Sequence, residues 1–555
     1  MLRIIIVRRR PNVKPEVQRK QRLRRAHKRR QFTKAFPKYP NRRPKPLDFE
    51  TEKRRCLRSQ RLFEDPEYPP EVAIPVHPVA EWRRPGKIVP KPEFYDGRTS
   101  RHDIQQTILG DCFFLAPLSL IADREELISK VVPKSQGFGA DYAGIFRFRF
   151  WQYGEWLEII IGNPPFTHSF FQALLVVDDR LPVNVFTKKL KFTRSRQYHH
   201  FWVPLVEKAY SKLYGGYANI HGGHAAFSMQ NLTGGISIFN LWRDRSPREL
   251  AKAYEKLLVE FQLGVLLCAK SGSRKRIRNA EGEIVAVHSM GLMPNHAYSV
   301  TGVRVVETQD GRRHRLLRIR NPWGRVEWTG AWAAGAAEWA KVRDPKVRRE
   351  LHDRELNGEW WMEWTDFVLF FKNVDRCYLG PETMVESENG KPATASSKCS
   401  FEYAPADGTW SNHWNTNGGG YPKGVTRGIF HRNPQYVVTI AANSKTIADA
   451  KGRVLVLWQV VQKYVREHGL AELLTGCVIY PLTAEEARQD KKFNLKFFQS
   501  RQPLNRITYS LLSSQRKKIP AGHFLFVPFC HRASGDGFFL LRNLRQRWTP
   551  IEGAF

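Results

Sequence analysis

The chain has 555 residues, 42% of them hydrophobic, and is long enough for about three or four globular domains. It contains no apolar run of about 18 residues and no signal-peptide core, so we expect no transmembrane helix and an intracellular protein. Its seven cysteines are odd in number and widely spaced. This argues against a disulfide framework or a zinc site and favours a reducing compartment.

Positive charge is concentrated at the N-terminus. The formal net charge is +37, and residues 1–60 carry +18 of it, from 22 Lys and Arg against 4 Asp and Glu. These residues are poor in apolar side chains and contain several prolines, so this basic arm should be disordered, or ordered by an anionic partner. Three interpretations stay open: a solvated tail, a targeting segment similar to a mitochondrial transit peptide, or a docking element for RNA or a ribonucleoprotein, tubulin or a membrane.

The predicted elements that follow the arm change from helix-rich to strand-rich. In chain order they are an extended connector from Pro66 to Pro78, a buried helix from Cys112 to Ile121, hairpins between residues 142 and 178, a helix over 202–214, and strands between 264 and 306 and over 316–319. After Lys372 short strands alternate with turns, a pattern that favours an antiparallel sandwich.

One cysteine stands where a thiol becomes reactive. Cys112 follows a Gly-Asp turn and opens an apolar helix, where backbone N–H groups and the positive end of the helix dipole lower the pKa of a thiol. Later segments supply His296 as a base and Asn321 as the amide that orients it. The order Cys, His, Asn predicts a cysteine protease triad, in a cleft between a helix-rich lobe with Cys112 and a β-rich lobe with the other two.

The residues around this triad resemble the calpain family of cysteine proteases. The matching segments are Gln106-Thr-Ile-Leu-Gly-Asp-Cys112, Leu205-Val-Glu-Lys-Ala-Tyr-Ser-Lys212, Thr233-Gly-Gly235, His296-Ala-Tyr-Ser-Val300, Asn321-Pro-Trp-Gly324 and Gly358-Glu-Trp-Trp-Met362. Trp410, Asn433-Pro-Gln-Tyr436 and the run from Gly522 to Pro528 are similar to the β-sandwich that follows the calpain core. No calcium-binding helix-loop-helix pattern is present, so we expect the C-terminal penta-EF-hand module of some calpains to be absent.

The resemblance implies an α+β fold, in which a two-lobed, papain-like calpain protease core precedes an antiparallel β-sandwich. The expected parts are the basic arm at 1–60, the helix-rich lobe with the nucleophile at 61–231, the β-rich lobe with His and Asn at 232–372, and the sandwich at 373–555.

The resemblance also implies a role for each site residue. Cys112 attacks the peptide carbonyl of a protein substrate, His296 accepts and returns the proton, and Asn321 orients the imidazole. Gln106 donates its amide N–H to the oxyanion, together with the backbone N–H of Cys112. Trp323 shields the His–Asn pair from water.

Calcium dependence is a further implication, because calpain cores bind two calcium ions through carboxylates. The acids that match are Asp103 and Glu207 for the first-lobe site, and Glu327 and Glu359 for the second-lobe site. Ala334 and Asn357 stand where the family has aspartates, so the second site should be weaker or vacant. The alternative is that Asp103 and Glu207 are ordinary surface acids.

Three positions next to the chemistry depart from the family pattern. Thr107 and Asn295 stand where the family has glycine, and Phe113 stands where it has tryptophan. These changes are expected to narrow the cleft without abolishing catalysis. The leading hypothesis is an intracellular, cytoplasmic, calcium-dependent cysteine endopeptidase. The alternative is a structural subunit that keeps the calpain fold with little or no activity, anchored by its basic arm to a ribonucleoprotein or a microtubule.

Overall fold

The computed structural model describes residues 7–8, 48–74, 80–95, 98–157, 175–239, 246–273, 276–278, 284–352, 355–379, 397–400, 403–410, 430–440, 453–463, 473–489, 492–505, 507–508, 510, 513–530, 537–545 and 547–550. They fall into two compact units, which we call the core unit, mainly residues 46–379, and the sandwich unit, mainly the residues after 393. Every residue proposed above for catalysis or calcium belongs to the core unit.

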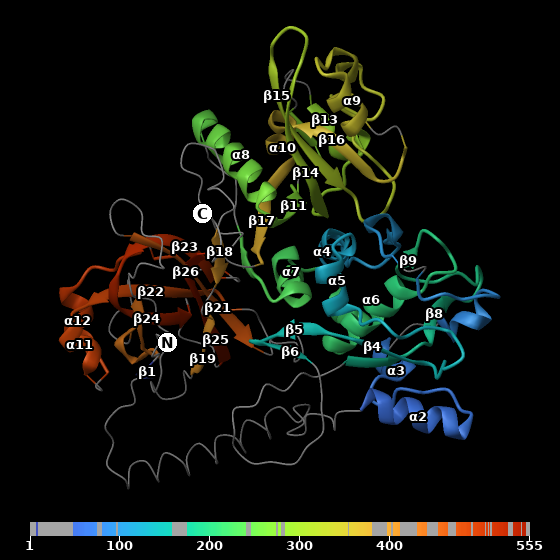
Figure 1. Cartoon of the computed structure of the whole chain (residues 1–555), viewed down its shortest axis with the longest axis horizontal. Coiled ribbons are helices and arrows are strands. Elements are labelled where there is room, and N and C mark those ends of the chain that lie inside the picture. The colour runs from blue at the N-terminus through green and yellow to red at the C-terminus, as the bar shows by residue number, and fades with distance from the viewer. Residues whose placement is uncertain are drawn as a thin grey trace. The chain divides into compact units, whose positions relative to one another are not determined.

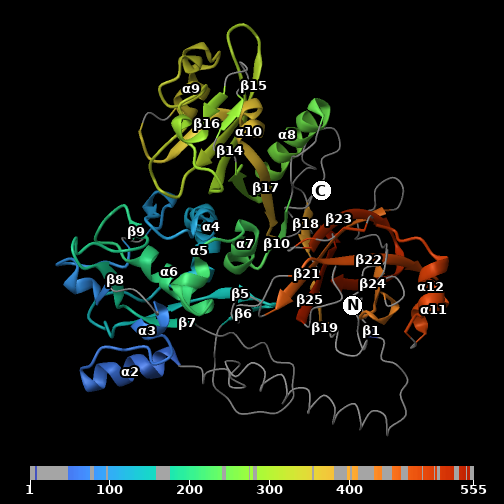
Figure 2. The same cartoon turned by 180° about the vertical axis from the view of Figure 1, so that it is seen from behind.

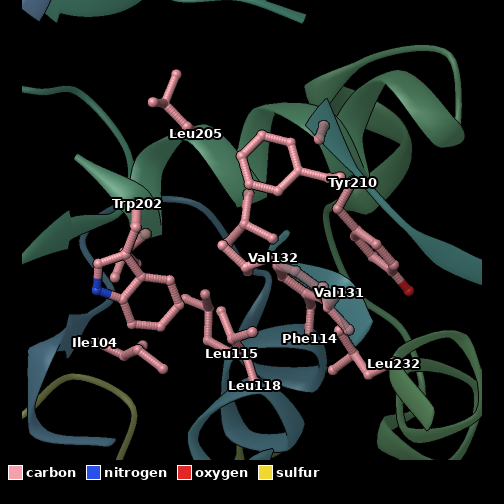
Figure 3. Packing of buried hydrophobic residues seen from close by; sticks show 14 of the residues in the cluster. Ile104, Phe114, Leu115, Leu118, Val131, Val132, Trp202, Leu205, Tyr210 and Leu232 are labelled. Carbon is pink, nitrogen blue, oxygen red and sulfur yellow. The ribbon is translucent and has the colours of Figure 1, made fainter. Parts of the chain in front are cut away.

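The first lobe of the core unit is built around a buried helix. α4 (Cys112–Ala122) is apolar on all sides, and every residue from Phe113 to Ala122 is buried, as expected of a helix enclosed by other elements. Figure 3 shows side chains of α4 meeting those of α5, α6 and α7, and the ring of Phe114 stacks on Tyr210 with centroids 3.9 Å apart. The helices and strands of this lobe are α2 (Phe49–Ser59), α3 (Pro70–Ala73), β2 (Ala80–Arg83), β3 (Ile104–Gln105), α4, α5 (Glu125–Val131), β4 (Ile145–Phe148), β5 (Phe150–Gln152), β6 (Glu155–Leu157), β7 (Leu175–Asp178), β8 (Leu181–Asn184), β9 (Arg194–Ser195), α6 (Trp202–Leu213) and α7 (Ala225–Thr233).

The second lobe is a six-stranded antiparallel sheet in the order β10-β17-β11-β14-β15-β16. Helix α8 lies beside β14 in both views (Figure 1 and Figure 2). The elements of this lobe are β10 (Ile236–Ile238), α8 (Pro247–Gln262), β11 (Leu266–Ser271), β12 (Arg276–Arg278), β13 (Ile284–Ala286), β14 (Ala297–Glu307), β15 (Arg313–Arg320), α9 (Pro345–Leu351), β16 (Glu359–Glu363), α10 (Trp364–Phe370) and β17 (Phe371–Tyr378).

The pairing of β14 with β15 brings two candidate residues together. The strands are antiparallel, and Ser299 near the start of β14 lies opposite Arg320 at the end of β15. His296 precedes the first strand and Asn321 follows the second. Because neighbouring antiparallel strands exchange hydrogen bonds directly, residues at these adjoining ends lie side by side.

Hydrogen bonds join the two lobes close to this point. The hydroxyl of Ser299 donates to the carbonyl of Ala116 in α4 at 2.9 Å, and the backbone N–H of Gln106 donates to the carbonyl of Pro322 at 2.9 Å. The guanidinium of Arg320, which is buried, donates to the carbonyl of Ile104 at 3.3 Å. The lobes are therefore in contact around the candidate site.

Two expected boundaries differ from the structure. Residues 49–59, assigned to the basic arm, form α2, which is capped by Asp48 and buries Phe49 and Cys56 against the β4 side of the first lobe. The prediction was wrong here because it gave more weight to the charge of this stretch than to its apolar residues, which lie on one face of the helix. The second lobe does not end at residue 372, because β17 pairs with β10 and β11 through Tyr378. The rest of the arm lies outside the described residues, apart from Val7 and Arg8 in β1.

The sandwich unit consists mainly of two four-stranded antiparallel sheets, in the orders β1-β20-β24-β22 and β19-β25-β21-β23. Alternate residues of strands from both sheets, such as Tyr436, Val456 and Phe526, share one apolar core, as expected when two pleated sheets pack face to face. Its elements are β1 (Val7–Arg8), β18 (Ser397–Ser400), β19 (Tyr403–Trp410), β20 (Tyr436–Ile440), β21 (Arg453–Lys463), β22 (Thr475–Leu482), α11 (Ala484–Arg488), α12 (Leu495–Ser500), β23 (Ser513–Pro520), β24 (Gly522–Cys530), β25 (Gly537–Arg545) and β26 (Arg547–Pro550).

The predicted α+β class is confirmed, with a mixed core unit and an antiparallel sandwich. Within the described part of the chain, no helix combines the length and the apolar character needed to cross a bilayer.

Candidate active site

Cys112 is the first residue of α4 and is half-buried. Burial raises the pKa of its thiol to about 11, although the backbone N–H of Ala297 acts in the opposite direction. The sequence-based expectation was a lowered pKa from the helix N-terminus. In this structure the cost of placing a thiolate in apolar surroundings is the larger effect.

His296 is held in one tautomer by Asn321. Its Nε2 lies 3.0 Å from the side-chain oxygen of Asn321, which also accepts the backbone N–H of Trp323. The Asn321 amide nitrogen donates to the carbonyls of Arg325 and Val326, both at 3.1 Å. These partners fix which end of the amide is oxygen, so Nε2 of His296 carries the proton and Nδ1 is left as the basic nitrogen.

The backbone and ring of His296 are also fixed. The hydroxyl of Ser271 accepts its backbone N–H at 2.9 Å, and Tyr298 and Trp323 meet the imidazole edge to face, with ring centroids 4.8 and 5.4 Å away. Asn295 has a φ of 56°, a left-handed conformation that asparagine adopts more readily than other non-glycine residues. Asparagine is therefore a physically suitable replacement for the family's glycine at this position.

The nucleophile and the base are not joined directly. Burial lowers the pKa of His296 to about 4, despite its bond to Asn321, so thiol and imidazole are both neutral at pH 7. Among the described residues, none of the hydrogen bonds links the Cys112 thiol to the imidazole. The structure thus brings His296 and Asn321 together, and brings Cys112 to the neighbouring residue, Ala297.

Gln106 does not have the orientation expected of an oxyanion donor. Its side chain is buried, and its amide nitrogen donates to the carbonyl of Leu109 at 2.7 Å and to the carboxyl of Asp111 at 3.1 Å. An amide has two N–H donors, so both are used. Thr107, the next residue, donates its hydroxyl to the carbonyl of Lys191 at 2.8 Å.

A buried pair of carboxyl groups, Asp111 and Glu207, lies behind the nucleophile. Asp111 is 0% and Glu207 1% exposed. Burial raises the pKa of Asp111 to about 7. Burial and the neighbouring Asp111 raise the pKa of Glu207 well above its usual value. Glu207 therefore keeps its proton and donates it in a hydrogen bond to Asp111. Our sequence reasoning missed Asp111, although it adjoins Cys112 in the Gly-Asp-Cys turn.

The four acids expected to bind calcium are each engaged by protein donors. Asp103 accepts the backbone N–H of Ser100 at 2.9 Å, and Glu207 accepts the backbone N–H of Thr193 at 3.2 Å in addition to facing Asp111.

In the second lobe, Glu327 accepts the backbone N–H of Gly358 at 2.7 Å. Among the described residues that line a cavity of about 490 Å³, Glu327 is the one acid, and Ala334 also lines this cavity. Glu359 pairs instead with Arg101 at 3.1 Å, across the lobes, and with Arg318 at 3.8 Å. Burial opposes the ionised form of Glu359, but these two arginines outweigh it and lower its pKa. As arranged here, the acids do not form a calcium ligand set.

Comparison with known proteins agrees with this geometry. The family model described as "Calpain family cysteine protease" matches residues 63–378, and "Calpain large subunit, domain III" matches residues 406–544. Calpain clp-4 of Caenorhabditis elegans is 34% identical over 513 residues, which cover 89% of this chain and 67% of the relative. Human calpain-8 is 35% identical over 521 residues (90% and 68%), and the human calpain-2 catalytic subunit is 33% identical over 529 residues (91% and 69%). The chain therefore belongs to the calpain family of cysteine proteases.

Proposed function

We propose that this chain is an active cysteine endopeptidase that cleaves protein substrates with Cys112 as the nucleophile. One observation carries the proposal: Asn321, with every amide donor and the side-chain oxygen partnered, holds the imidazole of His296 with Nδ1 as the basic nitrogen. An amide that selects the tautomer of the imidazole and leaves Nδ1 as the proton acceptor is the arrangement that a general base of such a triad requires.

In the proposed reaction, Nδ1 of His296 takes the proton of the Cys112 thiol as sulfur attacks the carbonyl carbon of the scissile peptide. The imidazolium then returns that proton to the leaving amine, which leaves an acyl-enzyme thioester. Water attacks the thioester, loses a proton to His296 and releases the carboxylic acid and the thiol. Trp323 beside the His–Asn pair limits the access of water to their hydrogen bond.

The oxyanion of the tetrahedral intermediate needs donors on the first lobe. The backbone N–H of Cys112 is available, because the first N–H groups of a helix have no intrahelical partner. We propose that Gln106 supplies the second donor after its amide leaves Asp111. Each such donor accelerates acyl transfer by about 10²–10³-fold.

Calcium dependence is a separate proposal. Asp103 and Glu207 are the acids proposed for the stronger site, and Glu327 and Glu359 for the weaker one. Their present partners would have to be exchanged before they bind an ion, so no step above passes through calcium.

We keep two further proposals from the sequence. An intracellular location is supported by six cysteines among the described residues that are in no disulfide bond, as expected in a reducing compartment. Docking of the basic arm to an anionic polymer rests only on its charge, because most of the arm lies outside the described residues.

Cleavage of casein by the full chain, with and without calcium, tests the proposed function. We expect Cys112→Ala to lower the rate by about 10⁴-fold or more, because no other side chain can replace the nucleophile. Cys56→Ala, at a buried cysteine packed with Phe49 and Phe63, is the matched control and should retain activity. Equal rates of cleavage by the wild type and Cys112→Ala would show that Cys112 is not the nucleophile. A wild type inactive in both conditions would favour the structural-subunit alternative.

A further inference from the structure

Three potential metal ligands meet just before α6, away from the triad residues. Glu93 and His200 form an isolated parallel bridge, in which the N–H of Glu93 donates to the carbonyl of His199 at 2.8 Å and the N–H of Phe201 donates to the carbonyl of Glu93 at 2.9 Å. Two backbone hydrogen bonds therefore hold the Glu93 segment beside His199 and His200. The main chain, and not flexible side chains, keeps these three residues close together.

The side chains converge as well. One ligand atom each from Glu93, His199 and His200 lies within 4.8 Å of the other two, and among the described residues this is the one group of three or more acids, histidines or cysteines with that property. The Nε2 of His200 lies 3.7 Å from a carboxylate oxygen of Glu93, and the two imidazoles cross at 76° with centroids 4.5 Å apart. Atoms that are each about 2 Å from one ion lie at most about 4 Å apart, so the His200–Glu93 separation already allows a shared ion, and the third ligand atom is within a small side-chain adjustment of it.

His200 provides a second, independent observation. The residue is 2% exposed, yet neither of its ring nitrogens has a hydrogen-bond partner among the described residues. Buried polar atoms nearly always have a partner in the protein, in water or in an ion. A buried imidazole with both nitrogens unpartnered, facing a carboxylate and a second imidazole, is the environment expected of a ligand.

We propose that Glu93, His199 and His200 bind a divalent transition-metal ion, with zinc as the first candidate. Two imidazoles and one carboxylate are a donor set that zinc accepts, whereas calcium requires six to eight oxygen ligands. Glu93 is exposed and His199 is half-buried, so water has access to complete the coordination. This site uses no residue of the proposed triad or of the proposed calcium sites.

The bound ion would cross-link two segments of the first lobe and so stabilise this lobe near the nucleophile. It would join the Glu93 segment to the residues that lead into α6, the helix that carries Glu207. The first residue of α6, Trp202, donates its backbone N–H to the carbonyl of Phe94, and its indole N–H donates to a carboxylate oxygen of Asp103 at 3.4 Å. The ion would therefore stabilise the elements that position the buried carboxyl groups of Asp111 and Glu207 near Cys112.

Calorimetric titration of the metal-free, untagged full chain with zinc chloride tests the proposal. We expect one tight zinc ion per chain, and a higher thermal unfolding temperature when it is bound. His199→Ala and Glu93→Gln should each lower zinc affinity by at least about 10-fold and remove the shift in unfolding temperature, since even loss of an outer partner lowers affinity by about 10–100-fold. His288→Ala, at an exposed histidine elsewhere, is the matched control.

Because Cys112 and His296 also offer zinc ligands, each titration is repeated in a Cys112→Ser chain. Binding that persists in Cys112→Ser and is lost in Glu93→Gln supports the proposed site. Binding lost in Cys112→Ser but retained in Glu93→Gln and His199→Ala assigns the ion to the triad and overturns the proposal. So does the absence of a tight zinc site in the wild type. If His199→Ala fails to fold, Glu93→Gln decides the matter, because its side chain is 52% exposed.

Discussion

The two lobes contribute halves of the candidate site that differ in how their polar groups are partnered. On the second lobe, Asn321 uses its amide donors on two carbonyls and its oxygen on His296 and the backbone. On the first lobe, Gln106 turns its donors toward Leu109 and Asp111, and its own oxygen has no hydrogen-bond partner among the described residues. Cys112 is a neutral thiol at pH 7.

This difference indicates which half must change before catalysis. The His–Asn half already has the tautomer and orientation that a general base requires, although burial keeps the pKa of His296 at about 4, and rearranging this half would break several buried hydrogen bonds. The first-lobe half, Cys112 and Gln106, lacks a thiolate at neutral pH, and the Gln106 amide is not available to donate to an oxyanion. Under the proposed function, activation therefore acts mainly on the first lobe, through the segment from Gln106 to Cys112 and the carboxyl pair of Asp111 and Glu207.

The largest expected effect concerns the second-lobe half. Asn321→Ala should lower kcat/KM for a peptide substrate by about 10²–10⁴-fold, because the imidazole loses the group that selects its tautomer. The same variant leaves the carbonyls of Arg325 and Val326 without their amide donors, which costs about 1–3 kcal/mol of stability. Urea unfolding of the variant therefore accompanies the kinetics. A folded variant with unchanged kcat/KM would show that this half is not prepared for catalysis.

The next effect concerns the oxyanion donor. If Gln106 leaves Asp111 during activation, Gln106→Ala should lower kcat by about 10²-fold with a smaller change in KM, because the oxyanion exists only during reaction. Gln105→Ala removes an amide from the half-buried neighbour and is the matched control. A value of kcat that is the same in Gln106→Ala and the wild type would mean that Gln106 keeps its resting role as a partner of Asp111.

A smaller effect tests the resting state of the nucleophile. With a thiol pKa of about 11, the thiolate fraction of Cys112 at pH 7 is about 10⁻⁴, and alkylation by iodoacetamide should accelerate about tenfold per pH unit from neutral pH upward. Mass spectrometry of the peptide that contains Cys112 gives the rate, with free cysteine as the reference thiol. A rate that is already at a plateau near pH 6 would instead show a thiolate–imidazolium pair in the resting protein.

Much of the second-lobe half could be predicted from the sequence. His296 and Asn321 flank two strands, and antiparallel pairing of neighbouring strands places the residue before one beside the residue after the other. The start of α4 at Cys112 also follows from local signals, since a Gly-Asp turn precedes a continuous apolar run. These features depend on short stretches of chain, whose periodicity and turn residues are visible in the sequence.

The first-lobe half depends on burial and on contacts between distant segments, which the sequence does not display. The dipole argument for Cys112 gave a lowered pKa because it omitted the cost of burial. The contact of Asp111 with Glu207 forms only when α6 packs behind α4, and the amide of Gln106 then follows Asp111. Helix α2 was missed for another reason: its Asp48 cap and its apolar face were present in the sequence, but the charge of the arm outweighed them.

The smallest expected effect concerns the carboxyl pair. The pKa of Asp111 is raised from 3.8 to about 7 in the folded protein, and that of Glu207 is raised further above its usual value. Between about pH 4 and pH 7 the unfolded chain therefore binds fewer protons than the folded chain, and the free energy of unfolding falls as pH rises through this window. The pair thus stabilises the protein fully only at acidic pH.

Glu207→Gln should flatten this dependence. The amide of glutamine donates to Asp111 at every pH, which removes the proton that Glu207 must keep and favours the ionised form of Asp111. Urea unfolding of the wild type and the variant between about pH 5 and pH 8 gives the slope of the free energy of unfolding against pH for each protein. The buried Asp375, whose pKa is also about 7, is present in both proteins, so its contribution cancels in the difference between the two slopes. Glu71→Gln, at an exposed glutamate of α3, is the control and should leave the slope unchanged. If Glu207→Gln kept the wild-type slope, the two carboxyls would titrate independently, and the first-lobe half would lack the shared proton that distinguishes it from the His–Asn half.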